Sequence, residues 1–178
     1  RCIVASSNGG KRAEIRSAPS YQGWEFVTVE DLGAVSPEVE EDGETFIDNA
    51  LIKAFAYREL FRLAAIADDS GLVVDALNGD PGVRSARYAG ENAADAENNT
   101  LLLRNLAGVL APQRTARFRC GIVYVDAHSL PTAAYGSCEW SIGFPPTADG
   151  GFSSYPPFLP RPPPGRTQPA PSLAATPS

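Results

Sequence analysis

Three polar segments of this chain carry residue types that bind phosphates or cations. In the first, Asp68, Asp69 and Ser70 follow the apolar run AAIA. Two adjacent carboxylates at the end of a buried strand repel each other unless a cation or a proton is shared between them. Mg²⁺ suits such a pair because it prefers carboxylate oxygens and keeps waters, one of which can act as a nucleophile. A polar turn closed by an Asx hydrogen bond is the alternative interpretation.

The second segment, SSNGGK at residues 6–11, lies between an apolar run and the expected start of a helix. Glycines let the backbone approach a ligand closely, exposed N–H groups at a helix start attract an anion, and Lys11 adds a mobile positive charge. These features outline a phosphate site. The P-loop pattern G-x-x-x-x-G-K-[ST] is absent, so an ordinary strand-to-helix turn is the alternative.

The third segment is an acidic run just before a predicted helix. Its carboxylates are Glu38, Glu40, Glu41, Asp42 and Glu44. A solvated loop that complements the helix dipole explains any single one of these residues. The acidic run indicates a function only in combination with the other two segments.

Hydrophobic spacing predicts the elements that must position these segments. The clearest is a helix from Thr45 to Phe61, with Thr45 as N-cap and Asp48 completing a capping box. A second helix is expected over 92–106, and a helix start near Lys11. Strands are expected at 2–6, 24–29, 64–77 (as two strands broken at 68–71), 117–127 and 132–143, with a turn around 129–131. Strands and helices alternate at first and two strands pair at the end, which predicts an α/β domain with a mixed sheet.

Charge and hydropathy exclude two classes of partner. The 178 residues carry a net charge of −6, whereas binding to nucleic-acid backbones requires clustered Lys and Arg. The N-terminal apolar run is four residues long, far shorter than a signal-peptide core or a membrane span. We therefore expect no nucleic-acid partner, no membrane insertion and a cytoplasmic location.

The cysteines and the histidine do not suggest a catalytic or metal centre. Cys2, Cys120 and Cys138 are widely spaced and lack a C-x-x-C pattern, which predicts reduced thiols. Cys120 and Cys138 lie in apolar stretches and are expected to be packed inside the protein. His128 is the only histidine, so no triad or imidazole zinc site can form, and it is expected at the surface.

Composition changes abruptly near Asp149. All 21 acidic residues lie at or before that position, whereas proline dominates the remainder. Proline fixes φ and lacks a backbone donor, so a helix or a central strand is not expected there. The chain is thus predicted to contain one domain at 1–151 and a Pro-rich tail at 152–178 that is disordered or adopts polyproline II.

The three segments, in this order, resemble the inosine triphosphate pyrophosphatase family of bacterial type. The resemblance covers residues 3 to about 151. It rests on SSNGGKRAEI, EEDGETFIDNALIKA, AIADDSGLVVDALNGDPGVRSARYAG and ARFRC. It implies an elongated mixed sheet flanked by helices, with two lobes around a substrate cleft, and a homodimer. The implied reaction is Mg²⁺-dependent hydrolysis of noncanonical purine nucleoside triphosphates such as dITP, ITP and XTP to the monophosphate and pyrophosphate.

The resemblance also assigns roles to individual residues. Asp69 is the expected catalytic base and, with Glu40, a ligand of Mg²⁺. Glu41 and Asp68 are near enough in sequence to assist. The substrate-binding residues are expected to be Ser6, Ser7, Asn8, Gly9, Gly10, Lys11, Ser70 and Phe152.

The C-terminal part departs from the family pattern. Family members continue after G-G-F with G-Y-D-P and, further on, a Lys and a Ser-His-Arg that contact the base and phosphates. Here Phe152 is followed by SSYPPF, and no Asp, Glu, Lys or His occurs beyond Asp149. A shifted reading frame near Asp149 is one hypothesis, testable by translating the other two frames of the encoding DNA.

Two alternatives to an active pyrophosphatase stay open. One is a catalytically impaired nucleotide-binding remnant of the same family. The other is a septum-inhibition type enzyme of similar fold that acts on pyrimidine or modified nucleotides. A Nudix hydrolase is set aside because the pattern G-x₅-E-x₇-R-E-x₂-E-E is absent.

Overall fold

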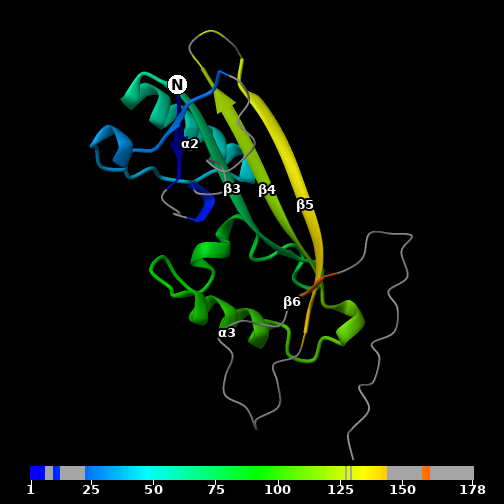
Figure 1. The fold of residues 1–178 in the computed structure, drawn as a ribbon. Helices are drawn as coiled ribbons and strands as arrows, with labels where there is room; N and C mark the ends of the chain where they lie inside the picture. The colour runs from blue at the N-terminus through cyan, green and yellow to red at the C-terminus, as the bar shows by residue number, and fades with distance from the viewer. Residues whose placement is uncertain (7–9, 13–22, 127, 129, 144–157, 161–178) are drawn as a thin grey trace, which may run out of the picture.

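A mixed β-sheet forms the framework of the protein (Figure 1). The computed structural model describes residues 1–6, 10–12, 23–126, 128, 130–143 and 158–160. The strands are β1 (Cys2–Ala5), β2 (Phe26–Val27), β3 (Ala64–Val74), β4 (Thr115–Val125), β5 (Thr132–Ile142) and β6 (Phe158–Pro160), in the order β2-β1-β3-β4-β5-β6. β1 runs parallel to β2 and β3, and the remaining pairs are antiparallel. The predicted α/β class with a mixed sheet is confirmed.

Helices α2 and α3 cover opposite faces of the sheet at opposite ends of its long strands. Side chains alternate between the two faces along a strand. Helix α2 (Phe46–Phe61) packs on Ala65 and Ala67, at odd positions of β3, whereas helix α3 (Asp95–Asn105) shares a core with Leu72 and Val74, at even positions. Figure 1 shows α2 near one end of β3, β4 and β5 and α3 near the other. The protein therefore has two separate hydrophobic cores joined by continuous strands.

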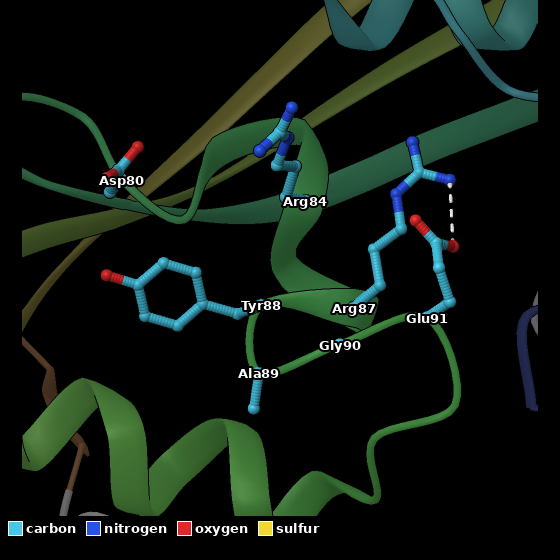
Figure 2. A pocket seen from close by; sticks show the side chains of 7 residues that line it. All are labelled: Asp80, Arg84, Arg87, Tyr88, Ala89, Gly90 and Glu91. Atoms are coloured by element: carbon cyan, nitrogen blue, oxygen red, sulfur yellow. Dashed lines mark ion pairs between the residues drawn. The ribbon is translucent and has the colours of Figure 1, made fainter.

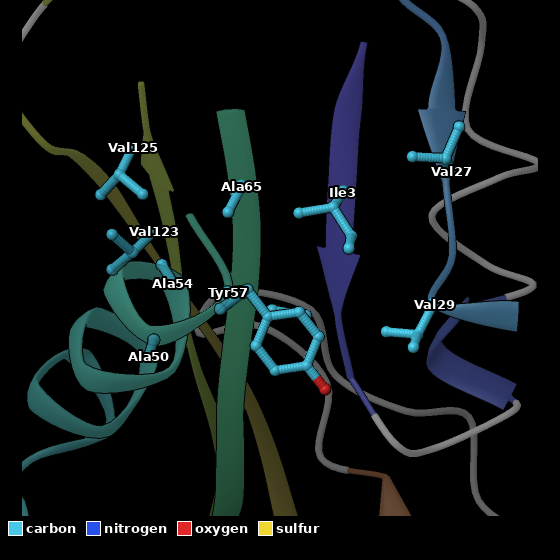
Figure 3. Close-up of a cluster of buried hydrophobic side chains, with 11 residues drawn as sticks. Ile3, Val27, Val29, Ala50, Ala54, Tyr57, Ala65, Val123 and Val125 are labelled. Atoms are coloured by element: carbon cyan, nitrogen blue, oxygen red, sulfur yellow. The ribbon is translucent and has the colours of Figure 1, made fainter. Parts of the chain in front are cut away.

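Helix α2 starts and packs as its sequence predicts. The Thr45 hydroxyl accepts a hydrogen bond from the Asp48 backbone N–H, and the Asp48 carboxylate accepts one from the Thr45 N–H, which completes the capping box. Small residues at Ala50 and Ala54 bring the helix close to the sheet, where Tyr57 fills the space near β1 (Figure 3). The packing of this core sets the distance between α2 and β3. It thereby positions the side chains that α2 extends over that strand.

The structure corrects the expected break in the third strand. β3 is one continuous strand, because every residue from Ala65 to Val74 has a partner on β4. The polar residues Asp68, Asp69 and Ser70 therefore lie within a strand and form neither a turn nor a strand end. Pairing with β4 satisfies the backbone N–H and C=O groups of these polar residues, so the strand does not have to break there.

Two other boundaries differ from expectation. β2 contains only Phe26–Val27 of the strand expected over 24–29, and α3 begins at Asp95, three residues after the expected start at 92. Part of the tail expected to be disordered is also ordered, since Phe158–Pro160 pairs with Trp140 to Ile142. Proline is tolerated there because β6 lies at the edge of the sheet. The rest of the tail falls outside the described residues.

Predictions for single side chains have mixed outcomes. His128 is exposed, as expected, and Cys2, Cys120 and Cys138 are free thiols. Cys138, however, is exposed on β5, because no helix covers this part of the strand among the described residues. Within the same part of the chain, no helix has the length and apolarity required to cross a bilayer.

Candidate active site

The site is built on an edge of β3 that β1 leaves uncovered. β1 ends at Ala5, opposite Ala67, so β3 continues beyond its parallel neighbour. Beyond the end of β1, side chains form the hydrogen bonds to the β3 backbone. The Asp68 carbonyl accepts a hydrogen bond from Lys53 Nζ at 3.0 Å, and the Leu72 N–H donates to Ser85 Oγ at 2.8 Å. Ligands in open α/β sheets commonly bind beyond the carboxyl end of a strand, and β1 ends at this point.

Asp68 meets the predicted phosphate-binding segment on one face of the sheet. Gly10, Lys11 and Arg12 are helical and follow β1 after a short connection. Lys11 Nζ lies 2.6 Å from Asp68 Oδ2. The Asp68 side chain is only 8% exposed, and its buried Oδ1 has no hydrogen-bond partner among the described residues. Lys11 therefore contacts Asp68 of the acidic pair, and its predicted role in binding phosphate stays a prediction.

Asp69 lies on the other face and is oriented by neutral donors. Its Oδ2 accepts a hydrogen bond from Asn49 Nδ2 at 3.0 Å, and its Oδ1 accepts one from the Ser70 N–H at 2.9 Å. Asn49 is fully buried in α2, and its own Oδ1 accepts a hydrogen bond from the Gly43 N–H at 2.8 Å. One amide therefore connects the acidic loop to the Asp69 carboxylate.

The acidic run approaches the site through Glu41. Glu41 Oε2 lies 2.9 Å from Lys53 Nζ, and the Glu41 carbonyl accepts a hydrogen bond from Arg87 Nη2 at 2.9 Å. Glu40 is exposed. Among the described residues no three His, Cys, Asp or Glu side chains cluster as metal ligands, and the predicted pairing of Glu40 with Asp69 stays a prediction.

The other predicted site residues differ in where they lie, and some are outside the described part of the chain. Ser6 is buried directly after β1, and Ser70 is half-buried on β3 beside Asp69. Gly10 belongs to the same helical turn as Lys11. Ser7, Asn8, Gly9 and Phe152 lie outside the described residues.

Sequence reasoning missed Asn49 and Lys53. They lie four residues apart on α2 and therefore on one face of the helix, and both reach β3. The available signal was their place among the apolar positions Ile47, Ala50, Leu51 and Ala54, where an amide and an ammonium group would otherwise be unexpected. Arg87 was missed as well, and no spacing rule identifies it.

Cys120 also belongs to this neighbourhood. It pairs with Ser70 across β3 and β4. Burial raises the pKa of the Cys120 thiol, the Asp68 charge raises it further, and the Lys11 charge acts in the opposite direction. The thiol beside the Lys11–Asp68 pair is therefore neutral at physiological pH and is not a nucleophile in this state.

The oxygen donors at this edge suit a hard divalent cation. Asp68 offers a buried carboxylate oxygen without a hydrogen-bond partner, and Asp69 receives hydrogen bonds only from neutral groups. Glu41 is paired with Lys53, and among the described residues it does not form a three-carboxylate cluster with Asp68 and Asp69. Mg²⁺ is normally held by one or two carboxylates together with phosphate oxygens and water. Single carboxylates on each face of β3 are therefore the groups at this edge that could contribute to holding a divalent cation.

Comparison with known proteins identifies the family of this fold and site. Residues 2–168 match the model of the Ham1 family. A dITP/XTP pyrophosphatase of Methylococcus capsulatus is 48% identical over 161 residues, covering 89% of this chain and 79% of the relative. A protein of the same name from Haemophilus influenzae is 46% identical over 154 residues, covering 85% and 78%.

Comparison with solved structures leads to the same family. A nucleoside-triphosphatase, or dITP/XTP pyrophosphatase, of Mycobacterium abscessus superposes with a TM-score of 0.75 at 40% identity, over 90% of this chain and 83% of that one. The Ham1 protein of Staphylococcus aureus gives a TM-score of 0.73 at 34% identity, over 88% and 79%. These likenesses extend over nearly the whole chain and confirm the resemblance found in its motifs. The chain belongs to the Ham1 family.

Proposed function

We propose that this chain hydrolyses noncanonical purine nucleoside triphosphates, among them dITP, ITP and XTP, to the monophosphate and pyrophosphate with the help of Mg²⁺. Relatives more than 45% identical bear the name dITP/XTP pyrophosphatase. The observation that carries the proposal is that Lys11 and Lys53 both contact Asp68 at the uncovered edge of β3, while the next residue, Asp69, has its carboxylate oriented on the opposite face. Two cations and an oriented carboxylate are what cleavage of a polyphosphate requires.

The two lysines are the proposed phosphate ligands of this chain. Each now neutralises a carboxylate, Lys11 with Asp68 and Lys53 with Glu41. Phosphate oxygens of the substrate could replace those carboxylates as partners of the two lysines. The carboxylates would then be available to hold Mg²⁺. The turn from Ser6 to Lys11 adds backbone N–H donors, and Ser70 and Phe152 complete the proposed substrate contacts.

Asp69 is the proposed general base. Its carboxylate accepts a proton from a water molecule whose oxygen forms a bond to the α-phosphorus. The bond between that phosphorus and the bridging oxygen breaks, and pyrophosphate leaves with the electron pair. Asn49 and the Ser70 N–H hold the carboxylate in one orientation for this transfer. Asp69 and Glu40, assisted by Glu41 and Asp68, would hold Mg²⁺, which would supply charge neutralisation on the phosphates.

The test is release of pyrophosphate from dITP and from dATP, each with and without Mg²⁺, by the wild type and by Asp69→Asn. We expect metal-dependent release, faster from dITP, and a loss of at least about 10³-fold in Asp69→Asn. Asp95→Asn is the matched control, because this exposed aspartate begins α3 in the other half of the protein.

Three other results have distinct meanings. Binding of dITP without release of pyrophosphate by the wild type would replace the proposal with the impaired remnant. Neither binding nor release would overturn both. Faster release from a pyrimidine or modified nucleotide than from dITP would favour the septum-inhibition type.

The proposal extends to a homodimer located in the cytoplasm. Residues Thr132 to Cys138 of β5 are exposed on both faces, which leaves room for a second copy. Sedimentation analysis of the full chain measures the mass in solution. A monomer at micromolar concentration would remove the dimer from the proposal without affecting the chemistry.

A further inference from the structure

A second hollow lies beside the site, between the 3₁₀ helix η3 (Gly82–Arg87) and the start of the segment that leads to α3. Its volume is about 490 Å³. It is lined by Asp80, Arg84, Arg87, Tyr88, Ala89, Gly90 and Glu91, and is called here the arginine pocket (Figure 2). No role proposed above uses Arg84 or the walls of this pocket.

The spacing of the two arginines places their guanidinium groups on one side of the pocket. Arg84 and Arg87 are three residues apart in η3, and side chains at i and i+3 of a 3₁₀ helix are superimposed along its axis. Figure 2 shows both side chains extending in the same direction from η3. Two planar groups with five N–H donors each thus extend from the same side of η3.

Arg87 is held in position, whereas Arg84 keeps its donors available. Arg87 Nη2 donates to the Glu41 carbonyl at 2.9 Å, and Arg87 Nη1 lies 3.8 Å from Glu91 Oε2. The Glu91 side chain is 80% exposed, so this ion pair is weak. Arg84 is exposed and forms no ion pair with any residue that the structure describes. Asp80 lies at the far side of the pocket from Arg87 in Figure 2.

We propose that the arginine pocket binds inorganic pyrophosphate. Adjacent guanidinium groups form paired hydrogen bonds to phosphoryl oxygens, and two such groups match the two phosphoryl groups of this anion. Asp80 and Glu91 balance the charge of the two arginines in the lining, so an anion would be bound here through directed hydrogen bonds from the guanidinium groups. The identification of the anion as the reaction product rests on the proposed function, and the binding itself does not.

Arg87 gives the pocket a direct connection to the site. Its guanidinium contacts the backbone of Glu41, whose carboxylate contacts Lys53. Glu41 therefore contacts Lys53 of the site and Arg87 of the pocket at the same time. Pyrophosphate bound in the pocket would compete with the Glu41 carbonyl for the Arg87 N–H groups and slow the next turnover.

Calorimetric titration with sodium pyrophosphate tests the binding, with EDTA present so that metal-dependent binding at the carboxylates is removed. The wild type, Arg84→Gln, Lys11→Gln and Arg62→Gln are compared. Arg62 is the matched control, because it is 80% exposed and lies at the end of α2, in the other half of the protein. We expect about tenfold weaker binding in Arg84→Gln and wild-type binding in Arg62→Gln, and the binding that depends on Arg84 should remain in Lys11→Gln.

Inhibition of dITP hydrolysis by added pyrophosphate is the second measurement. Arg84→Gln should keep the initial rate of the wild type and be inhibited about tenfold less strongly. Equal pyrophosphate affinity in Arg84→Gln and the wild type, or loss of binding only in Lys11→Gln, would overturn the proposal. If the wild type binds pyrophosphate through Arg84 but does not hydrolyse dITP, the pocket stands and the proposed function fails.

Discussion

Asp68 and Asp69 are adjacent in β3 and direct their carboxylates to opposite faces of the sheet. Asp68 pairs with Lys11 on one face, and Asp69 accepts a hydrogen bond from Asn49 of α2 on the other. The side-chain alternation of a strand separates the two charges that the sequence suggested must share a cation. One carboxylate is therefore set against a cationic side chain, while the other is oriented by an amide.

Replacing Lys53 by Gln should reduce hydrolysis of dITP. The Lys53 ammonium links Glu41 to the Asp68 carbonyl, and glutamine supplies neither the charge nor the reach of lysine. We expect kcat/KM to fall by about 10²-fold, because a charged group at a transferred phosphate contributes a few kcal/mol. Steady-state release of pyrophosphate from dITP measures the change.

Arg58→Gln is the control for this prediction. Arg58 lies on the same helix, is also partly buried, and donates to the Asp126 carbonyl away from the site. This variant should lose stability while keeping kcat/KM within about twofold of the wild type, as expected of a change remote from the site. Equal losses of activity in both variants would mean that Lys53 acts only by holding α2 in place.

Replacing Asn49 by Asp should destabilise the protein and reduce its activity. Aspartate keeps the acceptor for the Gly43 N–H but removes the donor that holds Asp69, and it puts a second carboxylate where the amide nitrogen now lies 3.0 Å from Asp69 Oδ2. Like charges in a buried site cost several kcal/mol, so we expect about 3 kcal/mol less stability in urea unfolding. Asn105→Asp, at an exposed position of α3, should change it by less than about 0.5 kcal/mol.

The elements with strong local signals were predictable from the sequence. The helix from Thr45 to Phe61 has a capping box and a regular apolar face, and it appears as α2 with nearly the same bounds. The run from Ala64 to Val74 was misjudged because Asp68 to Gly71 looks like a break. Only the ladder to β4 makes these residues strand, and pairing with a segment some fifty residues away leaves no local signature.

The site was predictable in its types of residue but not in its contacts. The motifs identified Lys11, Asp68 and Asp69, all of which lie at the uncovered edge of β3. They did not predict that Glu41 contacts Lys53 while Glu40 is exposed. Which carboxylate of an acidic run points inward depends on the exact path of the loop, and that path is fixed by tertiary contacts such as the hydrogen bond from Arg87 to the Glu41 carbonyl.

The three thiols should react with a maleimide in the order of their exposure. Cys138 is exposed, Cys120 is half-buried, and burial raises the pKa of Cys2 to about 11. Because the thiolate is the reactive form, Cys2 should react only after unfolding. Mass spectrometry of digested protein after timed labelling measures the order, and Cys138→Ser should lose the fast phase. Fast labelling of Cys2 in the native protein would contradict the buried position of β1.

Replacing Gly71 by Ala should destabilise the protein strongly. A Cβ at this position would lie 2.5 Å from the Gly82 carbonyl oxygen and 3.0 Å from Phe46 Cε1, and it would also overlap Ser85 Oγ. Neither a backbone carbonyl nor a buried ring can move cheaply, so we expect a loss of about 3 kcal/mol in urea unfolding. Because η3 would have to shift away from β3, pyrophosphate binding in the arginine pocket should weaken as well.

Gly136→Ala is the matched control, since this glycine also lies within a long strand. A Cβ there would meet no atom within 4 Å, and alanine restricts the unfolded chain more than glycine does. We expect unchanged or slightly higher stability, within about 1 kcal/mol of the wild type. If Gly71→Ala were equally harmless, η3 would not be packed against β3 as closely as the structure has it, and the arginine pocket would lose the support that fixes its two guanidinium groups.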